Sequence, residues 1–228
     1  RDLHLSNRRQ RQMCIRDRLN EGCLKPLKVI IPEGCMLAPI YPAAVVAGNV
    51  ETSQTVTNAI LGALGILGAS QGTMNNFTFG NEGAYQNYET ICGGSGAGPD
   101  FDGTDAVHTH MTNTRATDTE ILEWRFPVIV EALSIRLNSG GRGKHKGGNG
   151  IIRRVRFQEP MTAGITSSSR NCCPYGMAGG EPGKCGRNYV ERNDGTVEEL
   201  AGSDGADMEA GDVFVIETPG GGGYGSPE

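Results

Sequence analysis

Glycine most constrains what this chain can fold into, because it accounts for 35 of the 228 residues. A typical globular chain has only roughly 7% glycine. Many of these glycines stand in short runs, such as CGGSGAGP at 92–99, SGGRGKHKGGNG at 139–150 and TPGGGGYG at 218–225. Glycine weakens helices but permits tight turns and close approach of two backbones. We therefore expect a loop-rich protein with few long helices.

The length of 228 residues suffices for one large domain or two small ones with a real core. The net charge of -5 is uneven, because residues 1–18 contain many arginines and only two aspartates. We interpret this basic segment as disordered or as an artefact of sequence assembly rather than as a nucleic-acid arm. The rest of the chain is acidic, which makes nucleic acid an unfavourable partner.

The cysteines contain no CxxC pair and their number is odd, so we predict reduced thiols. No apolar run approaches the roughly 18 residues of a membrane helix, and no signal peptide pattern is present. These observations predict a cytoplasmic protein that does not enter the membrane. The cysteines are Cys14, Cys23, Cys35, Cys92, Cys172, Cys173 and Cys185.

Hydrophobic spacing predicts a short strand at 28–31 and then one helix. Thr52 or Ser53 is placed to cap that helix and Gly68 to end it. Its apolar residues recur at helical spacing, so we expect that face to be buried. They are Val56, Ile60, Leu64 and Leu67.

Residues 69–118 are polar and loop-rich, and a helical turn is expected at 119–124. The pattern then becomes typical of strands separated by turns, which predicts a mainly antiparallel sheet or sandwich. The fold class is therefore α+β: one buried helix and a loop-rich segment followed by this sheet. The strands are expected at 126–137, 151–158, 162–168, 187–191, 196–200 and 213–217.

Two histidines, His108 and His110, stand two residues apart in HTHMTNTR. On an extended strand both rings would face one side, where they could serve a metal ion, a proton shuttle or an oxyanion. A structural, hydrogen-bonded role is the commoner alternative. No third ligand is evident nearby, so no metal site is predicted. Arg115 could bind a carboxylate, or it could pair with Asp118 or Glu120.

The glycine runs allow functional and structural interpretations. ETICGGSGAGP at 89–99 places Glu89 and Cys92 among backbone N–H groups that could approach an anion or oxyanion, although a buried, inert Cys92 is favoured. The loop at 139–150 lacks a phosphate-loop pattern, and we interpret it as a solvated hairpin tip with a turn at Asn149-Gly150. The run at 218–225 is interpreted as a tightly packed closing turn.

Seven segments occur in one order and extend over nearly everything from residue 19 onward. They are AAVVAGNVETSQ at 43–54, SQGTMNNFTFG at 70–80, YETICGGSGAGP at 88–99, HTHMTNTRATDTEILEWRFPV at 108–128, SGGRGKHKGGNGIIRRVRF at 139–157, PYGMAGGEPGKCGRN at 174–188 and GDVFVIETPGGGGYG at 211–225. Together they resemble the hydantoinase B/oxoprolinase family. The resemblance implies that residues 19–228 are the C-terminal part of such a domain.

The resemblance implies ATP-dependent hydrolysis of a cyclic amide, 5-oxo-L-proline, to L-glutamate, in glutathione metabolism. It implies a hydantoinase A-type ATPase partner, fused or separate, that holds ATP and Mg²⁺. A divalent metal would bind upstream of this portion, and the full enzyme is expected to be a homo-oligomer. Within the family, a hydantoin or a carboxylated ketone is the alternative substrate. A non-catalytic β scaffold is the alternative of another class.

The resemblance also implies that the loops at 75–115 line the site of the B-type unit, where a small lactam binds. From the chemistry we assign catalysis to polar groups that can transfer protons, and substrate binding to amides and one arginine. The catalytic candidates are Glu89, His108 and His110. The substrate-binding candidates are Asn75, Asn76 and Asn113, for orienting hydrogen bonds, and Arg115, for the substrate carboxylate.

Overall fold

The computed structural model describes residues 28–227. The chain divides into two compact units at residue 45, and each is described by itself. Residues 28–45 form turns and contain no helix or strand, so the strand predicted at 28–31 is wrong. Val29 and Ile30 are 77% and 73% exposed. An apolar run forms a stable strand only where a neighbour supplies hydrogen bonds and a surface to pack on.

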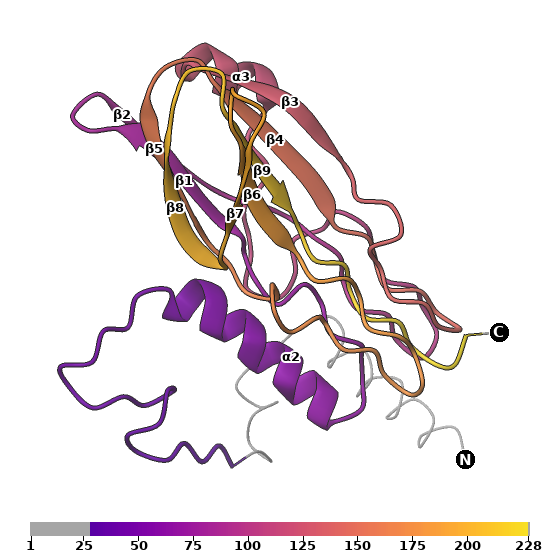
Figure 1. The fold of residues 1–228 in the computed structure, drawn as a ribbon. Coiled ribbons are helices and arrows are strands. Elements are labelled where there is room, and N and C mark those ends of the chain that lie inside the picture. Colours follow the sequence, from indigo (N-terminus) through magenta and orange to yellow (C-terminus); the bar gives the residue numbers. More distant parts are fainter. Residues whose placement is uncertain (1–27, 228) are drawn as a thin grey trace, which may run out of the picture. The chain divides into compact units, whose positions relative to one another are not determined.

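The second unit is built on two antiparallel sheets that pack face to face (Figure 1). One has the strand order β2-β1-β5-β8 and the other the order β3-β4-β9-β6-β7. The strands are β1 (Asn76–Asn81), β2 (Tyr85–Thr90), β3 (Val128–Ile135), β4 (Ile151–Phe157), β5 (Met161–Thr166), β6 (Arg187–Glu191), β7 (Val197–Leu200), β8 (Ser203–Met208) and β9 (Val213–Glu217). The helices are the π-helical turn η2 (Gly48–Thr52), α2 (Ser53–Ala63) and α3 (Thr119–Arg125).

Aromatic side chains from both sheets form the centre of the sandwich. Phe77 of β1 lies 4.9 Å from Phe214 of β9, and Phe79 of β1 lies 5.6 Å from Phe157 of β4, between ring centroids. All four rings are buried. Each contributes about 2–3 kcal/mol through burial of apolar surface. The β4 sequence IIRRVRF alternates between fully and partly buried residues, as a strand with one face in the core must.

The predicted α+β fold with an antiparallel sandwich is confirmed. The strands expected at 187–191 and 213–217 coincide with β6 and β9, and the other predicted strands differ by one or two residues at one or both ends. Three strands, β1, β2 and β8, were not predicted. NFTFGN of β1 and SDGADM of β8 are rich in asparagine, aspartate and glycine, which are uncommon in strands, and YQNYET of β2 has no aliphatic residue.

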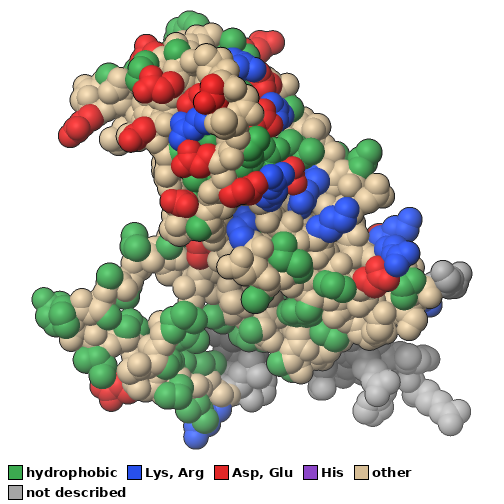
Figure 2. Space-filling view, viewed as in Figure 1, with side chains coloured by type: hydrophobic (Ala, Val, Ile, Leu, Met, Phe, Trp, Pro, Cys, Tyr) green, Lys and Arg blue, Asp and Glu red, His purple; other side chains and the backbone are tan. Residues whose placement is uncertain are grey.

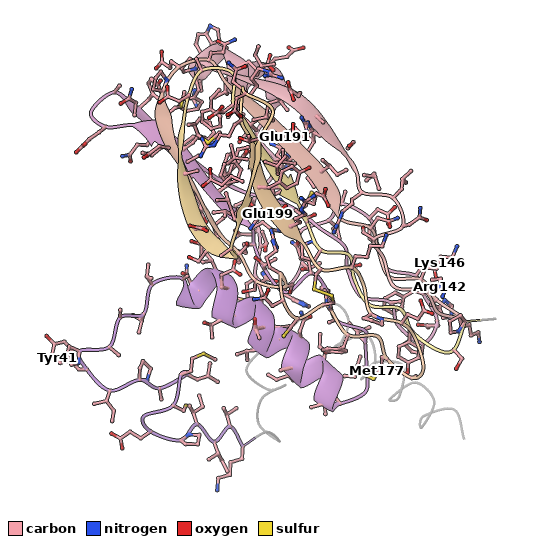
Figure 3. The ribbon with its side chains drawn as sticks, viewed as in Figure 1. Tyr41, Arg142, Lys146, Met177, Glu191 and Glu199 are labelled. Carbon is pink, nitrogen blue, oxygen red and sulfur yellow. A yellow bond between two sulfur atoms is a disulfide. The ribbon has the colours of Figure 1, made fainter. Side chains whose placement is uncertain are left out.

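The outer face of the five-stranded sheet carries paired charges, visible as adjacent blue and red side chains in Figure 2. Arg154 lies 3.1 Å from Glu131 and 2.7 Å from Glu191. Arg187 pairs with Glu199, and Figure 3 shows Glu191 and Glu199 on this sheet. Exposed pairs of this kind contribute about 0–1 kcal/mol each. The face is therefore an ordinary solvated surface.

The predicted turn at 119–124 is the helix α3. The Asp118 carboxylate accepts hydrogen bonds from the N–H groups of Glu120 at 3.0 Å and Ile121 at 3.2 Å, which caps the first turn. Leu122 anchors the helix in the core. Within the described part of the chain, no helix combines the length and the hydrophobicity needed to cross a bilayer.

Helix α2 lies where it was predicted, but the face that it buries is the opposite one. Ile60 and Leu64 are 55% and 67% exposed, and Figure 2 shows hydrophobic side chains on the outer surface of this region. The fully buried residues are Gln54 and Asn58. The prediction that the apolar face is buried is therefore wrong. Hydrogen bonds to two loops, rather than apolar contacts, fix the inner face of α2.

The ends of α2 also differ from the prediction. Because η2 runs directly into α2, Thr52 has helical backbone angles and its side chain makes no capping hydrogen bond. The helix ends at Ala63, and Gly65 follows with φ of 65°, the left-handed conformation that terminates helices. Gly68, the predicted end, is buried beyond the helix.

Residues 219–225 run through the middle of a bundle of extended segments instead of forming a turn. N–H groups three residues apart donate to the same neighbouring segment. This spacing matches the three residues per turn of a polyproline II helix. The donor and acceptor pairs are Gly220 with Lys184 at 3.2 Å, Gly223 with Glu181 at 2.9 Å, Gly221 with Gly148 at 2.8 Å, and Tyr224 with His145 at 2.9 Å.

Close packing of this segment is confirmed, because a Cβ at Gly221 would overlap the carbonyl oxygen of Ser95.

The prediction that residues 139–150 form a solvated hairpin tip is wrong for the glycines of this segment, which are largely buried in the same bundle. Its basic side chains are exposed, and Figure 3 shows Arg142 and Lys146 at the outer end of the bundle. The segment contains no Asn-Gly turn. Asn149 Oδ1 instead accepts hydrogen bonds from two backbone N–H groups across the loop.

One disulfide joins Cys173 and Cys185, whose Cα atoms are 4.5 Å apart. The prediction that all cysteines are reduced thiols is therefore wrong for this pair. A separation of 12 residues matches no cysteine motif, so the sequence alone did not reveal the pairing. Cys35, Cys92 and Cys172 are free, and Cys14 and Cys23 lie outside the described residues.

Candidate functional site

The buried polar side of η2 and α2 organises the candidate site. Glu51, Gln54 and Asn58 are spaced three and four residues apart, so they lie on one helical face. Gln54 Nε2 donates to the carbonyl of Thr109 at 3.1 Å and to the hydroxyl of Thr112 at 2.9 Å. We call Glu51, Gln54 and Asn58 the polar face of α2. It joins the loop before β1 to the loop that carries the two candidate histidines.

Glu51 is the most connected group of this polar face. Its Oε1 accepts hydrogen bonds from Thr73 Oγ1 at 3.0 Å, the N–H of Met74 at 3.0 Å and Asn76 Nδ2 at 2.8 Å. Its Oε2 is buried and has no hydrogen-bond partner among the described residues. Burial raises the pKa of Glu51, and the hydrogen bonds from Met74 and Thr73 oppose that shift. A buried carboxylate oxygen without a partner is costly, and a functional role is one explanation of its presence.

Both candidate asparagines, Asn75 and Asn76, lie in this cluster at the start of β1. Asn76 Nδ2 donates to Glu51 and to the carbonyl of Thr166 at 2.8 Å, and its Oδ1 accepts from the Tyr88 hydroxyl at 2.8 Å. Asn75 has a left-handed backbone, with φ of 46°. The amide groups of both residues are engaged within the protein. A role of either residue in substrate binding stays a prediction.

Arg170 is a site residue that sequence analysis did not single out. Its guanidinium donates to Asn75 Oδ1 at 2.8 Å, to Asn188 Oδ1 at 2.8 Å and to the carbonyl of Ser168 at 2.7 Å. Burial lowers the pKa of Arg170 to about 10, and the negative charge of Glu51 opposes that shift. Arg170 therefore stays charged at neutral pH. It supplies the positive charge of the cluster.

His110 joins the cluster through Asn58, whose Oδ1 lies 2.7 Å from His110 Nε2. The backbone of His110 is left-handed, with φ of 55°, so the histidine segment is not an extended strand. The same-side strand geometry expected for His108 and His110 is therefore wrong. Burial lowers the pKa of His110, which keeps its imidazole neutral near pH 7. A neutral imidazole is the form that can accept a proton.

His108 is partly buried, like His110, but its ring has a different environment. Both of its ring nitrogens are buried and have no hydrogen-bond partner among the described residues. Burial lowers the pKa of His108, again favouring the neutral ring. A buried imidazole without any partner is costly, which sets His108 apart from an ordinary structural histidine.

The other two candidates of this loop, Asn113 and Arg115, are exposed. Arg115 makes no ion pair within residues 28–227, and Asp118 caps α3 instead of pairing with it. The side chain of Arg115 is therefore free to meet an anionic ligand. No hydrogen bond in the described residues brings Asn113 or Arg115 to the polar face of α2.

Glu89 lies apart from this cluster, in the interior of the sandwich. It pairs with Arg153 of β4 at 3.0 Å, and both side chains are buried. Burial raises the pKa of the nearby Cys92 thiol, which the charge of Arg153 partly opposes. A thiol with a raised pKa is a poor nucleophile, in line with the interpretation of Cys92 as inert. The catalytic role assigned to Glu89 stays a prediction.

The structure thus brings Asn76 and His110 to the polar face of α2, and it keeps Glu89 and Arg115 elsewhere. Asn75 lies beside Asn76 but contacts Arg170 instead. The partners that spacing did not reveal are Glu51, Asn58 and Arg170. Within residues 28–227, no group of three histidine, cysteine or acidic side chains is arranged to hold a metal ion. A concave surface of about 1220 Å³ lies over the outer face of the four-stranded sheet. None of the candidate residues lines it.

Known proteins resemble this chain over most of its length. The model of the hydantoinase B/oxoprolinase family matches residues 10–227. A 5-oxoprolinase of Dictyostelium discoideum is 48% identical over 210 residues, which cover 92% of this chain and 16% of that protein. The 5-oxoprolinase 1 of Arabidopsis thaliana is 49% identical over 208 residues, which cover 91% of this chain and 16% of that protein. The chain therefore spans about a sixth of the length of these relatives.

A solved structure shares the architecture. The ATP-dependent caprolactamase from Pseudomonas jessenii superposes with a TM-score of 0.60 at 21% sequence identity. The superposition covers 71% of this chain and 30% of that one. At this level of identity the likeness concerns the fold alone.

Proposed function

Because the chain belongs to the hydantoinase B/oxoprolinase family, we propose that it works as part of an ATP-dependent 5-oxoprolinase. In that enzyme it helps to add water to an activated lactam and to open 5-oxo-L-proline to L-glutamate. The observation that carries this proposal is the identity of 48% and 49% to two 5-oxoprolinases over nearly the whole chain. The remaining parts of the reaction fall to regions outside these residues.

The chemistry of a lactam explains why the work is divided. An amide carbonyl is a poor electrophile, and phosphorylation of its oxygen makes the carbon open to water. ATP and Mg²⁺ are proposed to bind a hydantoinase A-type ATPase unit, fused or separate. The B-type site must then shelter the activated intermediate from stray hydrolysis. A divalent metal upstream and a homo-oligomeric assembly belong to the same proposal.

Within this scheme His110 is proposed as the group that accepts a proton from the attacking water. Burial lowers the pKa of His110, and the neutral ring suits that role. Arg115 is proposed to bind the carboxylate of 5-oxoproline, since it is exposed and free of ion pairs in the described chain. Asn113 would orient the ring beside it.

Arg115→Ala, assayed in the full-length protein with its A-type ATPase unit, tests the proposal. Wild type is expected to release glutamate from 5-oxoproline with matched ATP consumption. Arg115→Ala should raise KM for 5-oxoproline by about tenfold or more, because a charged hydrogen bond is lost. It should leave any reaction of hydantoin, which has no carboxylate, unchanged. Arg125→Ala, an exposed arginine at the end of α3, is the matched control.

Two outcomes would overturn the proposal. Hydantoin, or a ketone with bicarbonate, consumed in preference to 5-oxoproline would instead favour the family's other substrates. Alanine variants of His108, His110 and Arg115 that lose stability but keep full turnover would make this region a scaffold without catalytic residues.

A further inference from the structure

The amide of Asn58 has a fixed orientation. Its Nδ2 donates to the carbonyl of Ser70 at 3.1 Å, and its Oδ1 accepts from the Ser70 N–H at 3.1 Å. Rotating the amide by half a turn would set donor against donor and acceptor against acceptor. Asn58 is buried, so water cannot replace the two bonds that a flip would break. Oδ1 is therefore the atom that faces His110.

This orientation determines which nitrogen of His110 carries the proton. Asn58 Oδ1 can only accept, and it lies 2.7 Å from His110 Nε2. The neutral ring must therefore hold its proton on Nε2, because the other tautomer would oppose two lone pairs at that distance. Nδ1 is left with its lone pair free. Among the described residues no charged side chain contributes to the lowered pKa of His110, which arises from burial alone.

Asn58, the residue that faces His110, is itself held in place by Tyr175. The Tyr175 hydroxyl donates to the backbone carbonyl of Asn58, and the ring of Tyr175 fills the space that glycine leaves at position 62. The left-handed backbone of His110 is an uncommon conformation for a residue with a side chain, and such conformations concentrate at functional sites. The contacts of Tyr175 therefore fix the acceptor, and the acceptor orients the His110 ring.

We propose that Asn58 is a positioning residue that holds His110 in the Nε2–H tautomer, so that Nδ1 is the atom that accepts the proton from water during ring opening. This inference rests on the proposed function and adds to it the base atom and the residue that selects it. Asn58 itself touches no reacting atom. Its role resembles that of the group that orients a catalytic imidazole in a hydrolase.

The first test reads the tautomer directly and needs no activity. Nitrogen NMR of the intact protein labelled with ¹⁵N-histidine should show His110 with a protonated Nε2 and a bare Nδ1 at pH 7 to 8, and His110→Asn identifies its signals by their loss. A protonated Nδ1 would overturn the proposal. Asn58→Leu should remove the preference and give a mixture of tautomers.

The second test uses the pH dependence of kcat/KM for 5-oxoproline. Asn58→Asp places a carboxylate beside Nε2–H, which should move the acidic limb of the profile upward by about 1–3 pH units. Asn58→Leu should lower kcat by about tenfold or more with little change in KM. An unmoved acidic limb in Asn58→Asp would show that His110 is not the base held by residue 58.

The matched control is Asp212→Leu. Asp212 is likewise buried, and the hydrogen bonds that it accepts, from Arg192, Asn193 and Glu209 just before β9, involve no residue of α2 or of the histidine loop. Its loss should lower the melting temperature as much as Asn58→Leu does, while the pH profile stays in place. If wild type opens no lactam, the proposed function fails. The NMR result then still decides whether Asn58 sets the tautomer of His110.

Discussion

Glu89 and Arg153 form an ion pair across the interior of the sandwich, with side chains that are only 3% and 1% exposed. Arg153 Nη2 lies 3.0 Å from Glu89 Oε1, whereas Arg153 Nε and Nη1 have no partner in the described residues. Moving two charges out of water costs several kcal/mol per ion, which their attraction offsets only while both are present. The pair therefore makes each partner dependent on the other.

Replacing one partner should be far more harmful than replacing both. We expect Arg153→Met to destabilise the protein by about 3–5 kcal/mol, because Glu89 is left buried and unpaired. The double variant Glu89→Gln with Arg153→Met should recover a large part of that loss. Thermal unfolding of the intact protein measures both changes. Should Glu89→Gln abolish turnover at wild-type stability, Glu89 would be a catalytic residue and not a structural partner of Arg153.

The carboxyl of Glu51 should make stability depend on pH. Burial raises its pKa in the folded protein above the ordinary value of 4.5, so the folded state binds the proton more tightly than the unfolded state does. The resulting stabilisation is complete below pH 4.5 and is lost as pH rises through the folded pKa. The glutamine of Glu51→Gln is neutral at every pH, so this variant does not lose this stability as the pH rises. The melting temperature of this variant relative to wild type should therefore rise between pH 4.5 and pH 8.

The control for this experiment is Glu82→Gln, in the exposed turn between β1 and β2. Its melting temperature should follow wild type at every pH. A constant difference between Glu51→Gln and wild type across the pH range would show that the Glu51 carboxyl is not desolvated in the folded protein.

Gly221→Ala should prevent normal folding of the glycine-rich bundle. The new Cβ would overlap the Ser95 carbonyl oxygen, and no flexible side chain is there to yield. We expect a loss above about 3 kcal/mol, seen as poor soluble yield or a strongly lowered melting temperature. Gly48→Ala, where a Cβ meets nothing within 4 Å, should be tolerated. Equal tolerance of both substitutions would contradict the packing described for residues 219–225.

The Cys173–Cys185 disulfide should stabilise the protein against unfolding by about 3 kcal/mol, from the closure of a loop with a sequence separation of 12 residues. Cys173→Ser should remove that contribution and make the melting temperature insensitive to a reductant. Cys172→Ser, next to it but exposed and unpaired, should behave as wild type in both conditions. Unchanged stability of wild type under reductant would argue that the bond contributes nothing to folding.

The apolar pattern predicted β4, β6 and β9 well. β4 alternates because one of its faces lies in the core, whereas β9 is continuously apolar because both of its faces are buried, in two hydrophobic clusters. The same reasoning failed for α2. It assumes that the apolar side of a helix faces inward, whereas loops at Ser70 and Thr109 supply hydrogen bonds that satisfy a buried polar side. Strands such as β8 were missed because their turn-forming residues pair with a neighbour that lies far away in the sequence.

The sequence predicted which segments form the candidate site better than it predicted the individual residues. Asn76 and His110 were named, but their partners Glu51 and Asn58 lie 25 and 52 residues away in sequence, so local spacing could not connect them. A signal for these partners was present. The polar residues of ETSQTVTN repeat at helical intervals, which marks a face designed to make hydrogen bonds. Arg170 had no such pattern around it.

The bundle around residues 219–225 also sets the order in which the molecule can be completed. In its central segment Gly222 is hydrogen-bonded to Ala69 and Ala97, more than a hundred residues earlier, and Phe214 of the middle strand β9 packs against Phe77. On the ribosome, the earlier strands and glycine runs must therefore remain without their central partner until residues 213–225 have been translated. Until then strands of the incomplete sheet have unpaired edges, which can associate with other chains and aggregate. Because the central segment is synthesised last, we expect the chain to depend on chaperones during synthesis.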